Sequence, residues 1–464
     1  LFKNWKINII KEIIKNVKFN NNQKINNASI NSKKIKKNDI FFGIKGKHLD
    51  GNKFANEAIK NKATLSVIDK NYGKKGFKKV KIKNTLKHLS ESSYLVRKTS
   101  NINAIAITGS TGKTSLKELL GQSLKKLKST CYSNRSFNNK YGVPLSLFNI
   151  SKENIFGVFE VGMDKIGEID SLTKIIKPNI GVITNISYAH IKNFKNLSQI
   201  ANAKSEIINN ILNGGAVILN KDDDFFAYFK SKALKKNLKV ISFSKKINAN
   251  VRYIKSIKRK SKYILFILVN KKIIKLIVKE KNIHYLDNIL ASVAVISHVL
   301  GLKYLKKNLF YDFDLPDGRG DFKKIKIENK KINIIDESYN SNPLSLKFAV
   351  NKFDKMNIIS KNRKILLGDM LELGKFSIKL HNEAITIVNK SKINKVFVYG
   401  KYMNKAFNKI KTQKKGKILK NKNEILDLLK NDLKNNDYLM VKGSNATGLN
   451  MFFSKIKKGN FNVI

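Results

Sequence analysis

The sequence predicts an α/β protein built from three domains, and three observations support this. Its 464 residues suffice for about three domains of roughly 150 residues each, and 42% are hydrophobic, which permits large cores. A short apolar stretch at 104–108 leads through a glycine-rich turn into an amphipathic pattern. Later apolar stretches alternate with helical patterns and end in polar loops, as in doubly wound sheets. We expect a small α/β module at 1–100, a central α/β domain at 101–314 and a C-terminal doubly wound, Rossmann-like domain at 315–464.

The pattern of the first hundred residues predicts the small α/β module. The stretch from Ile30 to Gly46 has the pattern of two strands joined by a turn. A helix is expected at 52–60 and a short strand at 64–69. Spacing alone identifies no catalytic group in this part of the chain.

The central domain opens with a pattern typical of a phosphate-binding loop. A buried strand at 104–108 precedes Gly109-Ser110-Thr111-Gly112-Lys113-Thr114-Ser115, and a helix with leucines on one side follows. The glycines let backbone N–H groups converge on phosphate oxygens, and the helix N-terminus adds positive partial charge. Lys113 can reach the β- and γ-phosphates of a nucleotide, and the Thr114 hydroxyl can bind Mg²⁺. The general pattern would place its first glycine at Ile107, so this loop departs from that pattern.

Three further side chains follow expected elements of the central domain. Glu160 ends a buried strand, where α/β sheets bind ligands, and is a candidate Mg²⁺ ligand or a surface acid. His190 follows the strand expected at 179–185, although a lone histidine is more often structural. Lys204 lies on a helix expected at 198–212 and is by itself an ordinary solvated lysine.

The remaining segments continue the alternation of strands and helices. The central domain is expected to contain a strand at 214–220, strands with basic turns at 239–279 and a helix at 282–300. Leu315 to Gly320 interrupts the pattern and marks the second boundary. Beyond it, strands are expected at 332–335, 364–368, 396–399 and 438–441.

The composition is strongly basic, with 93 Lys and Arg against 33 Asp and Glu and a formal charge of +60. Such a charge by itself suggests nucleic acid or an anionic membrane as a partner. The lysines are spread over the whole chain together with an excess of Asn and Ile, so we favour codon bias over a selected surface for polyanions. A single cysteine, Cys131, fits a reducing compartment. Without an apolar run of about 18 residues or a signal-like start, we expect a cytoplasmic protein with no membrane span.

Several motifs resemble the Mur ligase family of peptidoglycan synthesis over nearly the whole chain. T-G-S-T-G-K-T-S, S-N-R-S-F-N-N-K-Y-G-V-P, E-V-G-M-D-K-I-G-E-I, T-N-I-S-Y-A-H and A-K-S-E-I occur in the family's order. I-D-E-S-Y-N-S-N-P, G-D-M-L-E-L-G and V-K-G-S-N-A resemble the branch that joins D-alanyl-D-alanine to UDP-N-acetylmuramoyl-tripeptide. The resemblance implies an ATP-dependent amide ligase that acts through an acyl phosphate, and we expect it to be a monomer.

The resemblance also implies roles for the residues around ATP. The phosphate loop, residues 109–115, would bind the nucleotide, with Lys113 on its phosphates. Thr114 and Glu160 would hold a first Mg²⁺. His190 would help to bind a second Mg²⁺, and Lys204 matches the lysine that the family carbamylates.

Other implied contacts lie further along the chain. Asn288 would contact the adenine, and Arg319 would reach the γ-phosphate from the C-terminal domain. Either Asp336 or Glu337 would contact the ribose, since the motif carries two adjacent acids.

Ser32 and Lys33 lie where the family binds the uridine nucleotide, which makes UDP-N-acetylmuramoyl-tripeptide and D-alanyl-D-alanine the expected partners. No nucleic acid is expected. Two alternatives stay open: a Mur-type ligase that adds the third amino acid, and a basic P-loop ATPase that depends on nucleic acid. The charge favours the second alternative, but no aromatic–basic stacking patch supports it.

Overall fold

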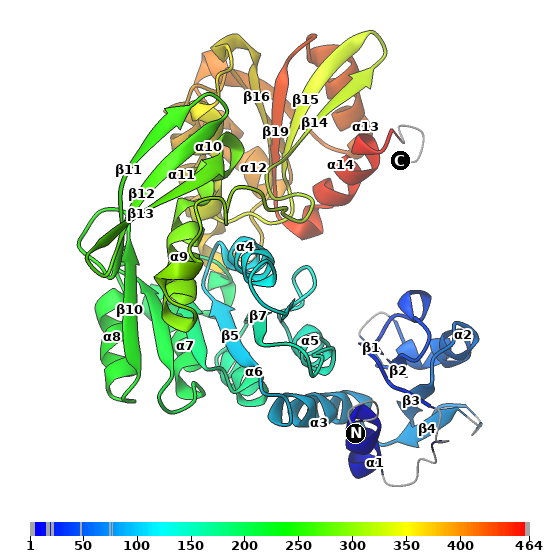
Figure 1. Cartoon of the computed structure of the whole chain (residues 1–464). Coiled ribbons are helices and arrows are strands. Elements are labelled where there is room, and N and C mark those ends of the chain that lie inside the picture. The colour runs from blue at the N-terminus through cyan, green and yellow to red at the C-terminus, as the bar shows by residue number, and fades with distance from the viewer. Residues whose placement is uncertain are drawn as a thin grey trace.

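The computed structural model describes residues 5–459 except 15–18, 20–22, 47–48, 74–75 and 77. Its strands form three sheets, of four, nine and six strands, which follow one another along the chain (Figure 1). Helices accompany every sheet, so the expected three-part α/β architecture is confirmed. The domain boundaries at residues 100 and 314 stay predictions. No helix of the described residues is long and apolar enough to cross a membrane.

The N-terminal unit contains a four-stranded parallel sheet in the order β1-β2-β3-β4. Its elements are α1 (Trp5–Ile13), β1 (Ala28–Ser29), β2 (Ile40–Phe42), α2 (Ala55–Lys60), β3 (Leu65–Asp69), β4 (Lys79–Ile82) and α3 (Thr85–Lys98). Figure 1 shows this sheet to one side of the other two units. Helix α3 joins it to the central unit by packing on α5 (Gly142–Phe148).

The central unit contains a nine-stranded sheet in the order β13-β12-β11-β10-β9-β8-β5-β7-β6. The strands from β6 to β10 are parallel, and β11 to β13 form an antiparallel meander at one edge. Its strands are β5 (Asn103–Thr108), β6 (Thr130–Tyr132), β7 (Phe156–Glu160), β8 (Ile180–Ile183), β9 (Ala216–Asn220), β10 (Lys239–Ser244), β11 (Val251–Arg259), β12 (Lys262–Val269) and β13 (Lys272–Lys279). Its remaining helices are α4 (Lys113–Lys125), α6 (Glu168–Ile176), α7 (Leu197–Asn209), α8 (Phe226–Leu234) and α9 (Leu286–Val299).

Strand β5 separates two hydrophobic cores because alternate side chains of a strand point to opposite faces. Ile105 and Ile107 pack in one core with the leucines of α4. Ala104 and Ala106 pack in the other core with the isoleucines of α7. The phosphate-loop helix and the Lys204 helix therefore cover opposite faces of the same strand.

The C-terminal unit contains a six-stranded sheet in the order β14-β15-β19-β16-β17-β18. Only the edge strand β14 is antiparallel to its neighbour. The strands are β14 (Asp321–Ile327), β15 (Lys330–Glu337), β16 (Arg363–Gly368), β17 (Lys395–Tyr399), β18 (Lys415–Leu419) and β19 (Tyr438–Lys442). The helices are α10 (Pro343–Lys355), α11 (Ser377–Asn389), α12 (Lys401–Ala406), α13 (Lys422–Asp427) and α14 (Leu449–Lys457).

The structure corrects the expected elements in three respects. The stretch 30–46, expected to contain two strands joined by a turn, contains the single strand β2, because β1 precedes it and Ser32–Lys34 forms a 3₁₀ turn. Strands β4, β14 and β18 were not expected, and each lies at the edge of its sheet. Edge strands tolerate charged side chains, and lysines interrupt the apolar pattern in all three. The helix expected at 282–300 begins as a 3₁₀ turn (Glu280–Tyr285), and the α-helix itself starts at Leu286.

Candidate active site

The phosphate loop connects β5 to α4 and needs glycine at two positions. Gly109 and Gly112 have φ angles of 142° and 81°, which side chains rarely allow. A Cβ atom at Gly109 would lie 1.9 Å from Oγ1 of Thr184. The Lys113 ammonium donates a hydrogen bond to the carbonyl oxygen of Gly109 at 2.7 Å, so its side chain folds back over the loop.

Residues that follow β8 hold the phosphate loop in shape. Asn185 Oδ1 accepts hydrogen bonds from the backbone N–H and the hydroxyl of Thr111, both at 3.0 Å. The Ser110 N–H donates to the backbone carbonyl of Asn185, and its hydroxyl donates to the carbonyl of Ser187. Sequence reasoning assigned no role to Asn185 or Ser187, although both lie in the T-N-I-S-Y-A-H motif.

A hydroxyl and a carboxylate meet at the start of α4. Thr114 donates a hydrogen bond to Oε2 of Glu160 at 2.7 Å, and the Asn138 amide donates to Oε1 at the same distance. Glu160 is 1% exposed at the end of β7. Hard oxygen atoms of this kind are the ligands that Mg²⁺ prefers. The pair predicted as a metal site is therefore brought together, with Asn138 as an additional, unpredicted member.

Arg319 reaches the central unit from the chain that precedes β14. Its Nη2 donates a hydrogen bond to the Ser136 hydroxyl at 3.2 Å, and its guanidinium lies 4.3 Å from the ring centre of Tyr339. Burial lowers the pKa of Lys113, the Glu160 charge raises it, and the Arg319 charge lowers it again, with a net lowering. Thr114, next to Lys113 in the chain, contacts Glu160 and lies 3.4 Å from the Ser136 hydroxyl that Arg319 reaches, so Glu160 and Arg319 both lie close to the phosphate loop.

Lys204 is buried on α7, with 1% of its surface exposed. Ile200, Ala203 and Ile207 of the same helix are also buried, and the burial of Lys204 itself shows that the alternative of an ordinary solvated lysine is wrong. Burial and the nearby charge of Lys113 hold the pKa of the Lys204 amine well below its usual value. Glu206, two residues on, accepts hydrogen bonds from the N–H groups of Gly167 and Asp170, which fixes the helix against the loop after β7.

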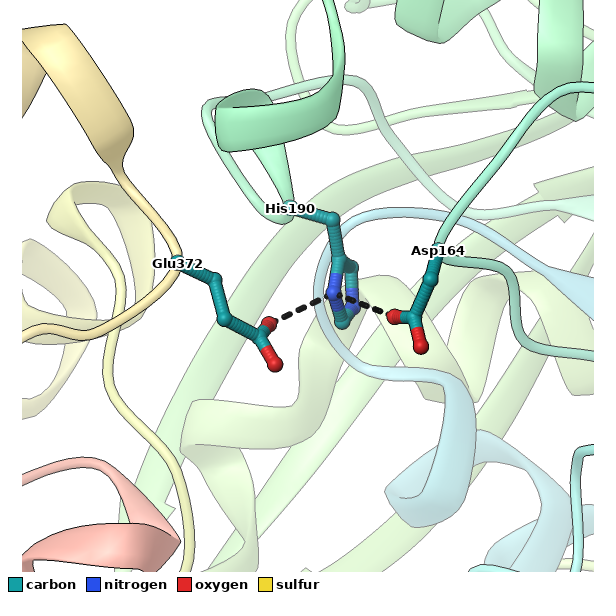
Figure 2. Close-up of side chains that lie close together, drawn as sticks. All are labelled: Asp164, His190 and Glu372. Carbon is teal, nitrogen blue, oxygen red and sulfur yellow. Dashed lines mark ion pairs between the residues drawn. The ribbon is translucent and has the colours of Figure 1, made fainter.

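His190 lies between two carboxylates (Figure 2). Its Nδ1 is 2.6 Å from Oε2 of Glu372 and 3.1 Å from Oδ1 of Asp164. Burial lowers the pKa of His190, but the two carboxylates raise it more, so the net shift is upward. The ligand atoms of the three residues lie within 4.8 Å of one another, but both carboxylates pair with the same ring nitrogen, so Nε2 is the nitrogen left for a metal ion. Sequence reasoning proposed His190 but gave no role to Asp164 or Glu372.

The two adjacent acids after β15 have different surroundings. Asp336 forms a buried ion pair with Lys457 at 2.6 Å and accepts a hydrogen bond from the Ser338 N–H. Glu337 lies 3.6 Å from the Lys352 ammonium, and its Oε1 is 2.7 Å from where a Cβ atom of residue 320 would lie. Glu337 is thus the acid beside Arg319 and Gly320.

Asn288 and the Ser32–Lys33 pair lie in different units. Asn288 lies in the first turn of α9 within the central unit, and its Oδ1 is 3.2 Å from where a Cβ atom of Gly112 would lie. Ser32 is buried in the N-terminal unit and donates a hydrogen bond to Glu57, whereas Lys33 is exposed. The structure brings Asn288 to the phosphate loop but does not bring Ser32 and Lys33 there.

A pocket of about 410 Å³ opens at the carboxyl ends of the C-terminal strands. Its polar lining includes Asp369, Tyr399, Lys401, Asn404 and Lys420. Asp369 accepts hydrogen bonds from backbone N–H groups of Tyr402 and Met403, so its carboxylate is already engaged. Ligands of open α/β sheets bind at this edge.

Comparisons with known proteins assign all three parts of the chain. Residues 24–90 match the family described as Mur ligase family, catalytic domain; residues 107–296 match Mur ligase middle domain; and residues 319–445 match Mur ligase, glutamate ligase domain. A UDP-N-acetylmuramoyl-tripeptide–D-alanyl-D-alanine ligase of Buchnera aphidicola (subspecies Baizongia pistaciae) is 32% identical over 94% of this chain and 93% of its own. The Rickettsia prowazekii protein of the same name is 30% identical over 93% of this chain and 95% of its own.

Solved structures agree in fold. The crystal structure of MurF from Acinetobacter baumannii superposes with a TM-score of 0.82 at 22% identity, covering 98% of this chain and 99% of its own. MurF ligase from Thermotoga maritima in complex with ADP gives 0.76 at 22% identity, covering 93% and 97%. With its three domains in family order and relatives matching along nearly its whole length, the chain belongs to the Mur ligase family, in the branch of the UDP-N-acetylmuramoyl-tripeptide–D-alanyl-D-alanine ligases.

Proposed function

We propose that this chain is the ATP-dependent ligase that joins D-alanyl-D-alanine to UDP-N-acetylmuramoyl-tripeptide in the synthesis of peptidoglycan precursors. The names and full-length coverage of its relatives support this activity. The geometric observation that carries it is the Thr114–Glu160 hydrogen bond beside Lys113, together with the Ser136 hydroxyl, which lies 3.4 Å from that of Thr114 and accepts a hydrogen bond from Arg319 of the C-terminal unit.

The chemistry requires activation of a carboxylate. The tripeptide carboxylate attacks the γ-phosphorus of ATP, the bond to the bridging oxygen breaks, and an acyl phosphate and ADP form. The dipeptide amine then attacks the acyl carbon, loses a proton and expels phosphate through a tetrahedral intermediate. Lys113 and Arg319 would offset the charge on the transferring phosphoryl group. Holding both substrates in place supplies a large part of the remaining acceleration.

We propose two Mg²⁺ ions, one bound by Thr114 and Glu160, which are hydrogen-bonded to each other, and one bound by His190 and a modified Lys204. Bound Mg²⁺ would polarise the phosphoryl oxygens and neutralise developing charge. Burial lowers the pKa of the Lys204 amine and so favours its uncharged form, which is the form that attacks CO₂. The new N–C bond and the loss of one proton give a carbamate, whose oxygens are hard ligands suited to Mg²⁺.

We assign the remaining contacts by position. Asn288 and Glu337, which lie beside the phosphate loop and Arg319, would bind the adenosine. Ser32 and Lys33 would bind the uridine nucleotide. The pocket at the carboxyl ends of the C-terminal strands is our candidate for the dipeptide, since Lys401 and Lys420 can pair with its carboxylate. We further propose that the ligase acts as a monomer in the cytoplasm.

The direct test is an assay of purified protein with Mg²⁺-ATP, UDP-N-acetylmuramoyl-tripeptide and D-alanyl-D-alanine. We expect pentapeptide, ADP and phosphate in equal amounts, and none of them with Lys113→Ala. A parallel reaction supplies UDP-N-acetylmuramoyl-dipeptide with diaminopimelate or L-lysine. Tripeptide formation there, without pentapeptide in the first assay, would establish the third-residue ligase instead.

A further inference from the structure

Glu372 connects the C-terminal unit to the central unit. It lies in the loop at 368–376, which follows β16 and is called the Glu372 loop here. Its carboxylate reaches His190 at 2.6 Å, as Figure 2 shows. Its backbone carbonyl accepts a hydrogen bond from the Lys192 N–H at 2.9 Å. The rings of Tyr188 and Phe376 lie 6.3 Å apart at the same contact, so main chain and side chains both join the two loops.

The backbone at this contact has an unusual conformation. His190 and Glu372 have φ angles of 61° and 64°, in the left-handed region that side chains disfavour. Gly374 has a φ of 55°, and a Cβ atom there would lie 3.0 Å from Cα of Lys192. Unfavourable backbone angles persist where the surrounding contacts determine them, and they cluster at functional positions. Two such residues meet across the boundary between the units, which indicates that this contact is a defined feature of the fold.

Each loop is also anchored within its own unit. The Met370 N–H donates to Nε2 of His381, and the Leu371 N–H donates to the Ser444 hydroxyl. On the central side, the Asn193 amide donates to the backbone carbonyl of Asp164 at 2.8 Å. Glu372 therefore moves with the C-terminal unit as a whole, whereas Asp164 belongs to the same unit as His190.

The arrangement affects which atom of His190 can act. Both carboxylates face Nδ1, which leaves Nε2 as the ring nitrogen that can bind a metal ion. A carboxylate on one ring nitrogen fixes the orientation and tautomer of the imidazole, and its loss typically weakens such sites. Asp164 supplies this support whatever the position of the C-terminal unit, but Glu372 supplies it only when that unit is seated.

We propose that Glu372 is a positioning residue of the ligase reaction, which completes the orientation of His190 only when the C-terminal unit is docked. The inference rests on the proposed function. Docking of the C-terminal unit would protect the reaction intermediate. An acyl phosphate formed before the unit that carries the amine substrate arrives would be exposed to hydrolysis. Closure of a unit over the site excludes water and assembles the reacting groups together.

The experiment compares the full-length variants E372A, E372Q, D164N, H190A and the double variant E372A/H190A. The matched control is E383Q, which makes the same change at an exposed glutamate of the same unit. We expect E372A to lower kcat about 10- to 100-fold with KM for ATP changed less than about threefold, and E372Q to lie between E372A and the control. Because Glu372 acts through His190, the double variant should be no slower than H190A alone.

A second measurement does not depend on turnover. With Mg²⁺ and a non-hydrolysable ATP analogue, small-angle scattering should give a larger radius of gyration for E372A than for E383Q and D164N. The proposal would be overturned if E372A had the same kinetics as E383Q, or if the losses of activity in E372A and H190A multiplied in the double variant. An unchanged radius of gyration of E372A would also overturn it. If the wild-type chain forms no pentapeptide, the proposed function fails, and the scattering data still decide whether Glu372 seats the C-terminal unit.

Discussion

At the scale of single residues, a few lysines differ from the other lysines of the chain because they are buried. Lys117, Lys204 and Lys442 are 0%, 1% and 2% exposed in a chain with 93 basic residues. Water stabilises an ammonium strongly, so a buried lysine has a lowered pKa and tends towards the neutral amine. A neutral amine has a free lone pair and can act as a nucleophile, which the ammonium of a surface lysine cannot do.

Lys204→Ala is expected to lose most ligase activity, because the site would lose the carbamate oxygen proposed to face Mg²⁺. Acetate or formate should restore part of the activity by filling the vacated ligand position. The measurement is pentapeptide formation with increasing acetate, with the exposed Lys195→Ala as the control. Full activity of Lys204→Ala would show that the residue has no catalytic role, and loss without rescue would argue against the carbamate.

Lys442 predicts a pH-dependent stability. Burial lowers its pKa to about 8, whereas the unfolded chain keeps a value near 10.5. Between these two values the unfolded state binds more protons, so the free energy of unfolding rises with pH, by about 3 kcal/mol for this residue. In urea unfolding, the free energy of unfolding of Lys442→Met should not show that rise between pH 8 and 10.5. Exposed Lys409→Met should behave like the wild type, and an equal rise in both variants would contradict the assignment.

At the scale of elements, the phosphate loop depends on the strand beside it. The loop follows β5, but Thr184 and Asn185 after β8 provide acceptors and close packing for it. Parallel strands end at the same edge of a sheet, which places the residues after neighbouring strands together. The shape of the nucleotide site is therefore a property of two strands and not of the glycine-rich motif alone.

Asn185→Ala should weaken nucleotide binding, since the Thr111 N–H and hydroxyl lose their shared acceptor. An unpaired polar group costs about 1–3 kcal/mol, which corresponds to an increase in Kd of about 5- to 150-fold. Titration with a fluorescent ATP analogue measures the change, and Asn213→Ala at an exposed position of the same unit serves as control. A Kd within twofold of the control would show that the loop keeps its shape without Asn185.

At the scale of the whole molecule, the charge of +60 raises the question of polyanion binding. Lys113 and Lys204 of the candidate active site have proposed roles in the reaction, and the remaining excess of lysine is diffuse along the chain. A diffuse charge attracts DNA at low salt, but the attraction falls steeply as salt is added.

DNA binding at about 0.15 M salt should accordingly be weak and should not stimulate ATP hydrolysis. The measurement is ATPase activity with and without duplex and single-stranded DNA, together with binding isotherms at several salt concentrations. Sub-micromolar, sequence-tolerant binding that accelerates hydrolysis would favour the nucleic-acid-dependent ATPase over the ligase.

The sequence by itself determined the three α/β units, the phosphate loop and the order of the motifs that contain Glu160, His190 and Lys204. Each of these depends on a pattern within a few neighbouring residues, such as an apolar strand followed by glycines. Buried strands were predictable for the same reason, whereas lysine-rich edge strands such as β14 were not, because an edge keeps only part of the apolar pattern.

Only the tertiary structure decided which distant residues meet. The pairing of His190 with Glu372, the contact of Arg319 with Ser136 and the burial of Lys204 all involve segments far apart in the chain. The motif around Asp336 and Glu337 contains two adjacent acids that the sequence could not tell apart. In the structure, Asp336 pairs with Lys457, whereas Glu337 lies near Lys352. Some of these contacts arise from the docking of units and others from packing within one unit, and one sequence carries no local pattern for the partner that a side chain finds far along the chain.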